Sequence, residues 1–218
     1  NYVQGILFQI STILPSLQAI LLPLVMSYFL KTNSIGLIFW IEGLVTIPLA
    51  LIFNYNRVAF VSLSKFANDP DRLRDIVSRF FIVMSLGTCV VFGLGAVLSK
   101  SIILLIFGSK WAEAVNYIHF SCIAFGIYSL RFLGLSVLSA INTPKIRIYN
   151  ELTLVILTSI LLIIFGRRFE MIGYFYATIV SYSVCFLIMI FSIRRCLHLA
   201  VYRRIFSVLM AMLISIVA

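Results

Sequence analysis

Charged residues are scarce in this sequence, and their scarcity excludes most classes of soluble protein. They make up 11% of the 218 residues, whereas hydrophobic residues make up 62% and the mean hydropathy is +1.13. A soluble domain of this length needs a polar shell over its core, and there are too few charged residues to form one. We therefore expect an integral membrane protein, in which the bilayer takes the place of that shell.

The sequence also lacks the motifs of the common enzyme classes. There is no Gly-rich phosphate loop and no Gly-x-Ser-x-Gly turn, and neither histidine has an acidic or nucleophilic partner at a recognisable spacing. Four cysteines lie in or at the ends of apolar runs without a Cys-x-x-Cys pair, which favours small buried hydrophobes over metal ligands or disulfides: Cys89, Cys122, Cys185 and Cys196. We therefore expect no catalytic residue, no metal and no other cofactor.

Long apolar runs are what the sequence does have. An α-helix needs about 20 apolar residues to cross a hydrocarbon core of about 30 Å. Six runs reach that length, which predicts an all-α polytopic transmembrane bundle with helices at about 3–30, 35–62, 76–98, 114–140, 146–165 and 171–193. A seventh run begins within 201–218. Because the chain starts at Asn1 and stops in an apolar run, we expect a fragment of a longer protein.

Lysine and arginine divide unequally between alternate connections, which predicts the orientation in the membrane. Basic residues accumulate in the cytoplasmic connections of membrane proteins. One set of connections holds five of them, and the other holds ten: Lys65, Arg72, Arg74, Arg79, Lys145, Arg147, Arg194, Arg195, Arg203 and Arg204. We expect the set of ten to face the cytoplasm. The net charge of +10 then indicates topology and attraction to anionic lipid headgroups, not binding of nucleic acid.

One charged stretch interrupts the apolar runs, and it has the pattern of a helix start in water. Asp69 suits the N-cap, Pro70 suits the first helical position, and Asp71 and Asp75 place negative charge in the first turns. The pattern predicts that one crossing ends near Lys65 and that the next helix begins at the cytoplasmic surface.

Three stretches resemble a known family in the order and spacing of their motifs. The first, "SIGLIFWIEGLVTIPLALIFNYNRVAFVSLSKFANDPDRLR", holds a Gly-aromatic start, an inner proline, an Arg-hydrophobic-Phe stretch and an acidic-Pro helix start: Gly36, Phe39, Pro48, Arg57, Phe60 and 69–73. The second, "LLIFGSKWAEAV", resembles a short outer-surface helix with Phe107, Gly108 and Trp111. The third, "LSAINTPKIRIYNE", resembles a Pro-basic inner turn, with Asn142 where glycine is more usual.

In these features the chain is similar, from about Leu14 to about Arg195, to bacterial polysaccharide and O-antigen flippases of the multidrug, oligosaccharidyl-lipid and polysaccharide exporter superfamily. The resemblance implies a V-shaped exporter with two lobes of helices, of which 1–200 would be the carboxy-terminal lobe and 201–218 the truncated start of a further helix. It implies a multi-pass protein of the bacterial cytoplasmic membrane that moves an undecaprenyl-diphosphate-linked oligosaccharide outward by ion-coupled alternating access. The implied partners are that oligosaccharide, membrane lipids and the missing amino-terminal lobe.

Ionisable residues deep within the predicted crossings need an explanation, because charges there are costly and usually face a cavity or one another: Glu42, Arg57, Arg131 and Glu151. Arg131 and Glu151 lie about 10–13 Å from the same inner turn at about 1.5 Å per residue, on consecutive antiparallel helices. Their matching depth predicts that they interact. Glu42 and Arg57 lie on one helix and are separated by about 22 Å along its axis, which is too far for direct pairing.

Position suggests a role for each of these charges. Guanidinium matches phosphate oxygens in a two-pronged geometry, so we expect Arg57 and Arg131, toward the inner side, to bind the diphosphate of the substrate. Glu42, near the outer end, is the candidate for coupling to a proton or sodium ion. Plainer explanations stay open, because Arg57 can reach the inner headgroups, Arg131 and Glu151 can form a purely structural pair, and Glu42 can be interfacial. Trp111 and the tyrosines are typical of interface anchors.

Two alternatives to export of a lipid-linked oligosaccharide also stay open. A multidrug exporter or a peptidoglycan-precursor flippase of the same superfamily has the same composition, although the Phe-Gly-x-x-Trp element and the Asp-Pro helix start lean toward polysaccharide. A membrane enzyme that acts on lipid-linked glycans generally needs a sizeable outer loop or clustered His, Asp and Arg. The connections here are short, which favours a transporter over an enzyme.

Overall fold

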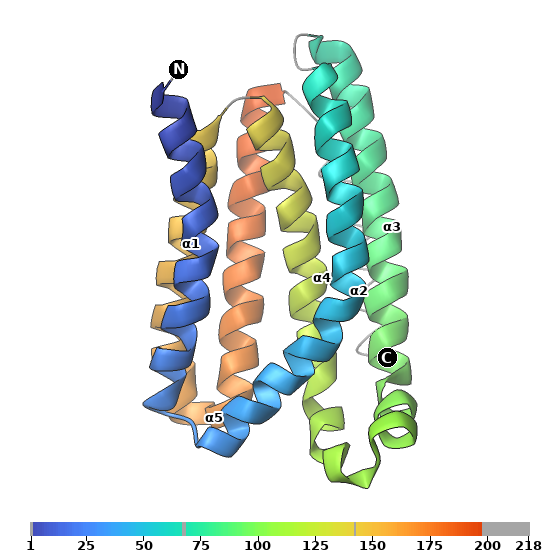
Figure 1. Cartoon of the computed structure of the whole chain (residues 1–218), viewed down its shortest axis with the longest axis vertical. Coiled ribbons are helices and arrows are strands. Elements are labelled where there is room, and N and C mark those ends of the chain that lie inside the picture. Colours follow the sequence, from blue (N-terminus) through green and yellow to red (C-terminus); the bar gives the residue numbers. More distant parts are fainter. Residues whose placement is uncertain (1, 67–68, 142, 198–218) are drawn as a thin grey trace.

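The computed structural model describes residues 2–66, 69–141 and 143–197. These residues form only helices, which confirms the prediction of an all-α fold (Figure 1). The predicted start of a seventh helix at 201–218 lies outside the described residues. In chain order the elements are α1 (Tyr2–Ser27), α2 (Thr32–Lys65), α3 (Pro70–Ile102), the π-helix η1 (Ile103–Phe107), the 3-10 helix η2 (Ser109–Trp111), α4 (Ala112–Ala140) and α5 (Pro144–Leu197).

The helices run up and down the long axis of the molecule, so their connections gather at its two ends (Figure 1). One end holds the start of α1 and the α2–α3 and α4–α5 connections. It is called the inner end, after the orientation that the basic residues predict. The other end, called the outer end, holds the α1–α2 connection together with η1 and η2.

Four helical stretches are long and apolar enough to cross a membrane: Thr32–Asn56, Asp71–Phe107, Ser109–Ala140 and Lys145–Cys196. The prediction of six separate crossings is therefore confirmed only in part. In α1 the apolar stretch Ile13–Ser27 is shorter than these four. The crossings predicted at 146–165 and 171–193 both lie in α5, which spans 54 residues, one on each side of a non-helical residue, Glu170.

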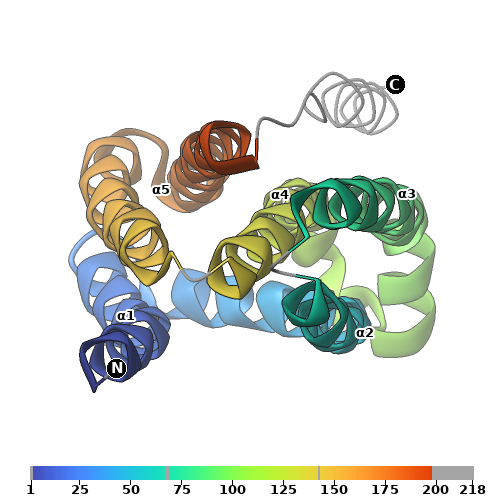
Figure 2. The same ribbon diagram turned by 90° about the horizontal axis from the view of Figure 1, so that it is seen from above.

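The helix α5 breaks at Glu170, whose φ of 48° and ψ of −121° are not helical. The break divides α5 into a first arm before Glu170 and a second arm after it, and the two arms lie side by side (Figure 2). Gly173 permits this tight turn, because a Cβ atom there would lie 2.3 Å from the backbone oxygen of Phe165. The turn therefore falls in the charged interruption that separates the two apolar runs.

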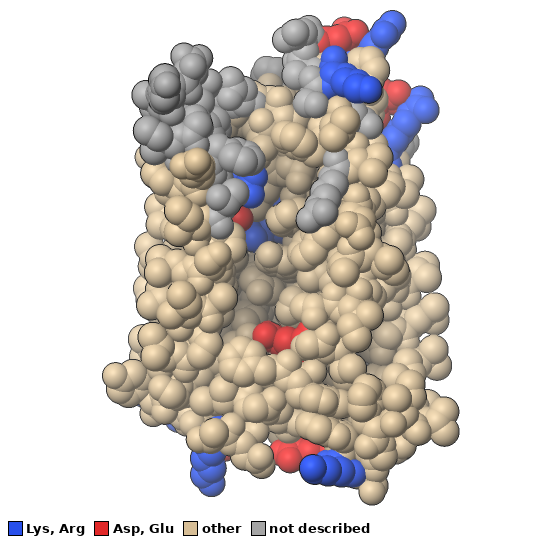
Figure 3. Space-filling view, viewed as in Figure 1, with Lys and Arg blue, Asp and Glu red and all other residues tan. Residues whose placement is uncertain are grey.

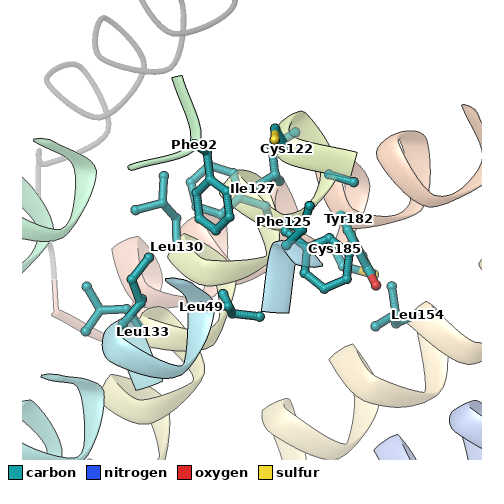
Figure 4. Packing of buried hydrophobic residues seen from close by; sticks show 14 of the residues in the cluster. Leu49, Phe92, Cys122, Phe125, Ile127, Leu130, Leu133, Leu154, Tyr182 and Cys185 are labelled. Carbon is teal, nitrogen blue, oxygen red and sulfur yellow. The ribbon is translucent and has the colours of Figure 1, made fainter. Parts of the chain in front are cut away.

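The central helix of the bundle is α4. It packs against α2, α3 and α5, and α1 packs against α5. Apolar side chains from four helices fill the interior around α4, and Figure 4 shows some of them: Leu49 of α2, Phe92 of α3, Leu130 of α4 and Leu154 of α5. By contrast, α1 and α2 hardly touch each other.

Large apolar side chains stay exposed in stripes along the outer helices. Residues three or four apart share one face of a helix. On α3 such a face carries Val83, Leu86, Val90, Leu94 and Val97, each more than half exposed. On α1 a similar face carries Ile13, Leu17, Ile20 and Leu24. Soluble proteins rarely expose apolar surface of this extent, whereas exposed apolar stripes are expected of helices that cross a membrane.

The start of α3 follows the predicted pattern. Asp69 is the N-cap, and its side chain accepts a hydrogen bond of 3.2 Å from the backbone nitrogen of Arg72. Pro70 is the first residue of the helix, so α3 begins before the crossing predicted at 76–98. One turn further on, Asp75 pairs with Arg79 at 2.9 Å. The prediction of a capped helix start in water is confirmed.

The helix α2 bends about midway along its length (Figure 1). Pro48 lies inside this helix. Proline has no backbone N–H and its ring crowds the preceding turn, so it kinks a helix in which it lies. The bend divides α2 into an outer half, which starts at Thr32, and an inner half, which ends at Lys65.

Candidate functional site

The polar side chains of interest lie in two groups within the bundle. The first, called the inner cluster, consists of Tyr128 and Arg131 of α4 with Arg147, Asn150 and Glu151 of α5. The second consists of Glu42 on the outer half of α2 and Tyr174 on the second arm of α5.

Arg131 and Glu151, which their matching depth predicts to interact, lie in contact. The Nη2 atom of Arg131 is 2.7 Å from Oε2 of Glu151. The Nε atom of Arg131 donates to Oδ1 of Asn150 at 2.8 Å, and Nδ2 of Asn150 donates to the backbone oxygen of Cys185 at 2.8 Å. Arg131 is 1% exposed and Glu151 is 4% exposed. The cluster therefore joins α4 to both arms of α5.

Arg147 adds a second guanidinium to the inner cluster. It precedes Glu151 by four residues, so both side chains lie on one face of α5. Its Nη1 atom donates to Oγ of Ser139 at 3.1 Å, and its charge acts on Glu151 and Arg131. Arg147 is predicted from the sequence only as a cytoplasmic basic residue, although its spacing of four residues from Glu151 is a signal for this role. The inner cluster holds two arginines and one glutamate, and its formal charge is positive.

The surroundings of Arg131 bear on its predicted role in substrate binding. Its side chain is nearly fully buried, and its Nε and Nη2 atoms already donate to Asn150 and Glu151. In this conformation a diphosphate has no access to it. The other predicted phosphate-binding residue, Arg57, lies in the inner half of α2, and its side chain is outside the described part of the structure.

Glu42 lies apart from the inner cluster. Oη of Tyr174 donates to Oε1 of Glu42 at 2.5 Å. Glu42 is partly exposed and Tyr174 is 4% exposed. Among the described residues Glu42 forms no ion pair, and Tyr174 is its hydrogen-bond partner. A carboxylate without a cationic partner at membrane depth is costly, and such groups mark functional sites by default.

A line of buried polar side chains runs between the two groups. Tyr174, Thr178 and Tyr182 are each four residues apart on the second arm of α5, so they lie on one helix face over about 12 Å. The ring of Tyr182 is 5.1 Å from that of Tyr128, between ring centroids. Tyr182 also interacts electrostatically with Glu42, Arg131 and Glu151. It therefore lies between the outer carboxylate and the inner cluster.

These buried tyrosines correct the expectation that tyrosines anchor the protein at the membrane interface. Tyr174 and Tyr182 are 4% and 8% exposed and face the interior. Aromatic residues of the expected kind do occur at the outer end, where Trp40 of α2 stacks on Trp111 with ring centroids 4.0 Å apart. Phe107 meets Trp40 edge-on at 5.1 Å, and Gly108 makes the turn between η1 and η2 with a φ of 80°.

The face between α1 and α2 is hollowed (Figure 3). Within the hollow, called the groove, a few charged atoms lie among uncharged ones, whereas the other charged atoms of this face gather at the two ends. The groove follows from the packing, because α1 packs on α5 and α2 packs on α4 without closing on each other. Charged groups inside an apolar bundle that line a groove are typical of proteins that move polar molecules.

Helices with lipid-facing apolar stripes and interior charges define a polytopic helical membrane protein. Residues 5–116 match a family model described as polysaccharide biosynthesis protein, and the chain belongs to this family. The match confirms the resemblance seen in the sequence to a family of the flippase type. It includes Glu42 and Arg57 but ends before Arg131 and Tyr174. No curated protein and no solved structure matches the chain.

Proposed function

We propose that this chain is one lobe of a flippase that moves an undecaprenyl-diphosphate-linked oligosaccharide across the bacterial cytoplasmic membrane by ion-coupled alternating access. Membership of a polysaccharide biosynthesis family carries this proposal. The groove supports it, because a lipid-linked glycan needs a polar path for its headgroup while its apolar tail stays in the bilayer. The protein then acts as a transporter and not as an enzyme.

In this proposal the groove between α1 and α2 is one wall of the transport path. The missing amino-terminal lobe supplies the opposite wall, since α1 and α2 leave the groove open on that side. The diphosphate enters at the inner end, where substrate is made, and the glycan leaves at the outer end.

Arg57 is the residue that we propose to receive the diphosphate, because it lies on the inner half of α2. A guanidinium can bind two phosphate oxygens at once. Arg131 would join it only after leaving Glu151 and Asn150. In the present conformation we assign Arg131 to holding α4 against α5.

Glu42 is the residue that we propose to couple transport to a proton or sodium ion. Its position near the outer end faces the external supply of ions. Its lack of a cationic partner among the described residues supports this role, because no side-chain cation there competes with an incoming ion for the carboxylate.

Complementation of a flippase-deficient strain with the complete gene tests the proposal. We expect Arg57→Lys to retain part of the export, because the charge remains, and Arg57→Ala to retain little, with lipid-linked precursor accumulating on the inner leaflet. Lys65→Ala is the matched control, since Lys65 is an exposed cation at the inner end of the same helix. Full export by Arg57→Ala would reduce that arginine to a headgroup anchor. Failure of the unmodified gene to restore export would contradict the proposed function.

A further inference from the structure

A side-chain hydrogen bond joins the outer half of α2 to the second arm of α5. α2 packs mainly on α4, where Ile38, Ile41 and Val45 are buried, and it makes little contact with α5. The hydrogen bond from Tyr174 to Glu42 crosses from one element to the other, between residues 132 positions apart in the chain. Packing on α4 holds the outer half of α2 in the bundle, and this bond adds a direct link from that half to α5.

The two residues of this hydrogen bond differ in how firmly their surroundings hold them. Tyr174 is 4% exposed and its ring packs on Phe175 at 5.5 Å, so its hydroxyl is held in place by the core. Glu42 is partly exposed on a half-helix that ends at the Pro48 bend. Hinges form at a few positions where backbone geometry can change, and a proline kink with its missing hydrogen bond is such a position. Tyr174 is therefore the fixed partner, and Glu42 is the movable one.

The hydrogen bond between Tyr174 and Glu42 depends on whether the carboxylate is ionised or protonated. From α5, the titratable groups that interact with Glu42 are Tyr174 and Tyr182. No described side chain of α1, α3 or α4 forms an ion pair or hydrogen bond with it. A hydrogen bond to an ionised carboxylate is roughly twice as strong as one between neutral groups. A proton taken up by Glu42 from the groove therefore weakens the bond to Tyr174.

We propose that Tyr174 is the positioning residue for Glu42, and that their bond ties the outer half of α2 to α5 until Glu42 takes up a proton or a cation. Release of the tie lets the outer half of α2 move about the Pro48 bend and widens the outer end of the groove. The step adds one proton or cation to the carboxylate and breaks one hydrogen bond. That this movement serves transport rests on the proposed function. The movement itself can be measured without substrate.

Distance measurements between spin labels on the purified full-length protein in lipid nanodiscs test the tie. Labels are placed on cysteines that replace Asn33 and Arg168, both exposed at the outer end of α2 and of the first arm, in a background without the native cysteines. In the parent protein we expect a short distance at high pH and a shift to longer distances at low pH. Tyr174→Phe should give the longer distances at every pH.

Two further variants keep the test decisive. Tyr176→Phe is the matched control, because Tyr176 lies on the same arm but is 41% exposed, and it should behave as the parent. Glu42→Gln should reproduce Tyr174→Phe, and it covers the case in which loss of the buried hydroxyl impairs folding. Distances that do not respond to pH in the parent, or that keep their pH response in Tyr174→Phe and Glu42→Gln, would overturn the inference. A parent protein with the expected distances that fails complementation would count against the proposed function alone.

Discussion

Glu42 and Glu151 both lie within long apolar helices of this bundle, and their surroundings are opposite. Glu151 is 4% exposed and contacts Arg131 at 2.7 Å, within a cluster that joins three helical segments. Glu42 is partly exposed and has a phenol as its hydrogen-bond partner. Separating a buried ion pair strands a charge, so the inner contact is fixed. A carboxylate with a neutral partner can exchange that partner, so the outer contact can change.

The comparison indicates that this chain uses membrane-embedded charge in two ways. The inner cluster fixes the packing of α4 on α5, which forms the back of the groove. The outer carboxylate connects two elements that otherwise touch little. If the proposed movement of α2 occurs, the inner cluster serves stability and the outer carboxylate serves movement, and substitutions should separate the two.

The largest effect is expected from breaking the inner pair. Arg131→Met leaves Glu151 buried without its cation and should destabilise the protein by about 3–5 kcal/mol. Combining it with Glu151→Leu should cost less than the sum of the two single changes, because no stranded charge remains. Folded yield and thermal unfolding of the four proteins of this cycle measure the coupling. Additive losses would contradict a direct pair.

The next effect is expected at the turn that links the two arms of α5. Gly173→Ala places a Cβ atom 2.3 Å from the backbone oxygen of Phe165, and a backbone atom cannot move aside cheaply. We expect a loss of about 2 kcal/mol, with displacement of the arm that carries Tyr174. Gly87→Ala is the control, since a Cβ atom at Gly87 meets nothing within 4 Å. Equal thermal stability of the two variants would show that the turn relaxes freely.

A smaller effect is expected from Asn150, which supports the inner pair without carrying charge. Asn150→Leu removes the acceptor of Arg131 Nε and the donor to the Cys185 backbone oxygen. The Arg131–Glu151 contact remains, so we expect a loss of about 1–2 kcal/mol in thermal unfolding. A loss as large as that of Arg131→Met would mean that the amide, and not the ion pair, holds the inner cluster together.

The smallest effect is expected at the outer carboxylate. Glu42→Gln replaces the charge-assisted bond from Tyr174 by a weaker neutral one and strands no ion, so we expect thermal stability to fall by only about 0.5–1 kcal/mol. Glu151→Gln, measured beside it, should cost several times more because Arg131 loses its counter-ion. Similar losses in the two variants would erase the distinction between a fixed and a movable glutamate.

The sequence predicted the inner pair but not the outer contact, for a geometric reason. The depths of Arg131 and Glu151 can be measured from one short turn at Pro144, so helix rise alone places them at the same level. The contact between Glu42 and Tyr174 depends on the bend of α2 and on the turn of α5, which bring together residues 132 positions apart. Apolar periodicity predicts neither the direction of the bend in α2 nor the geometry of the turn in α5.

The tyrosines show where the sequence pattern was misjudged. Composition favours interface anchors for aromatic residues in membrane proteins, and Trp40 and Trp111 do lie at the outer end. Tyr174 and Tyr182, however, share a helix face with Thr178, and that polar spacing of four residues was a signal for an inward face. In α5 the two apolar runs were located as separate helices, which agrees with its two arms, but apolar periodicity did not predict how tight the turn at Glu170 is.

The tryptophan stack at the outer end makes this chain a natural optical reporter. The chain has two tryptophans, and both belong to the stack, with their ring planes within 9° of parallel. Trp40 is two residues before Glu42 on the outer half of α2, whereas Trp111 ends η2 and leads into α4. All of the intrinsic tryptophan fluorescence of these 218 residues therefore originates at the place where α2 meets the start of α4. Its emission wavelength and quenching register the packing of that one junction, without any attached dye.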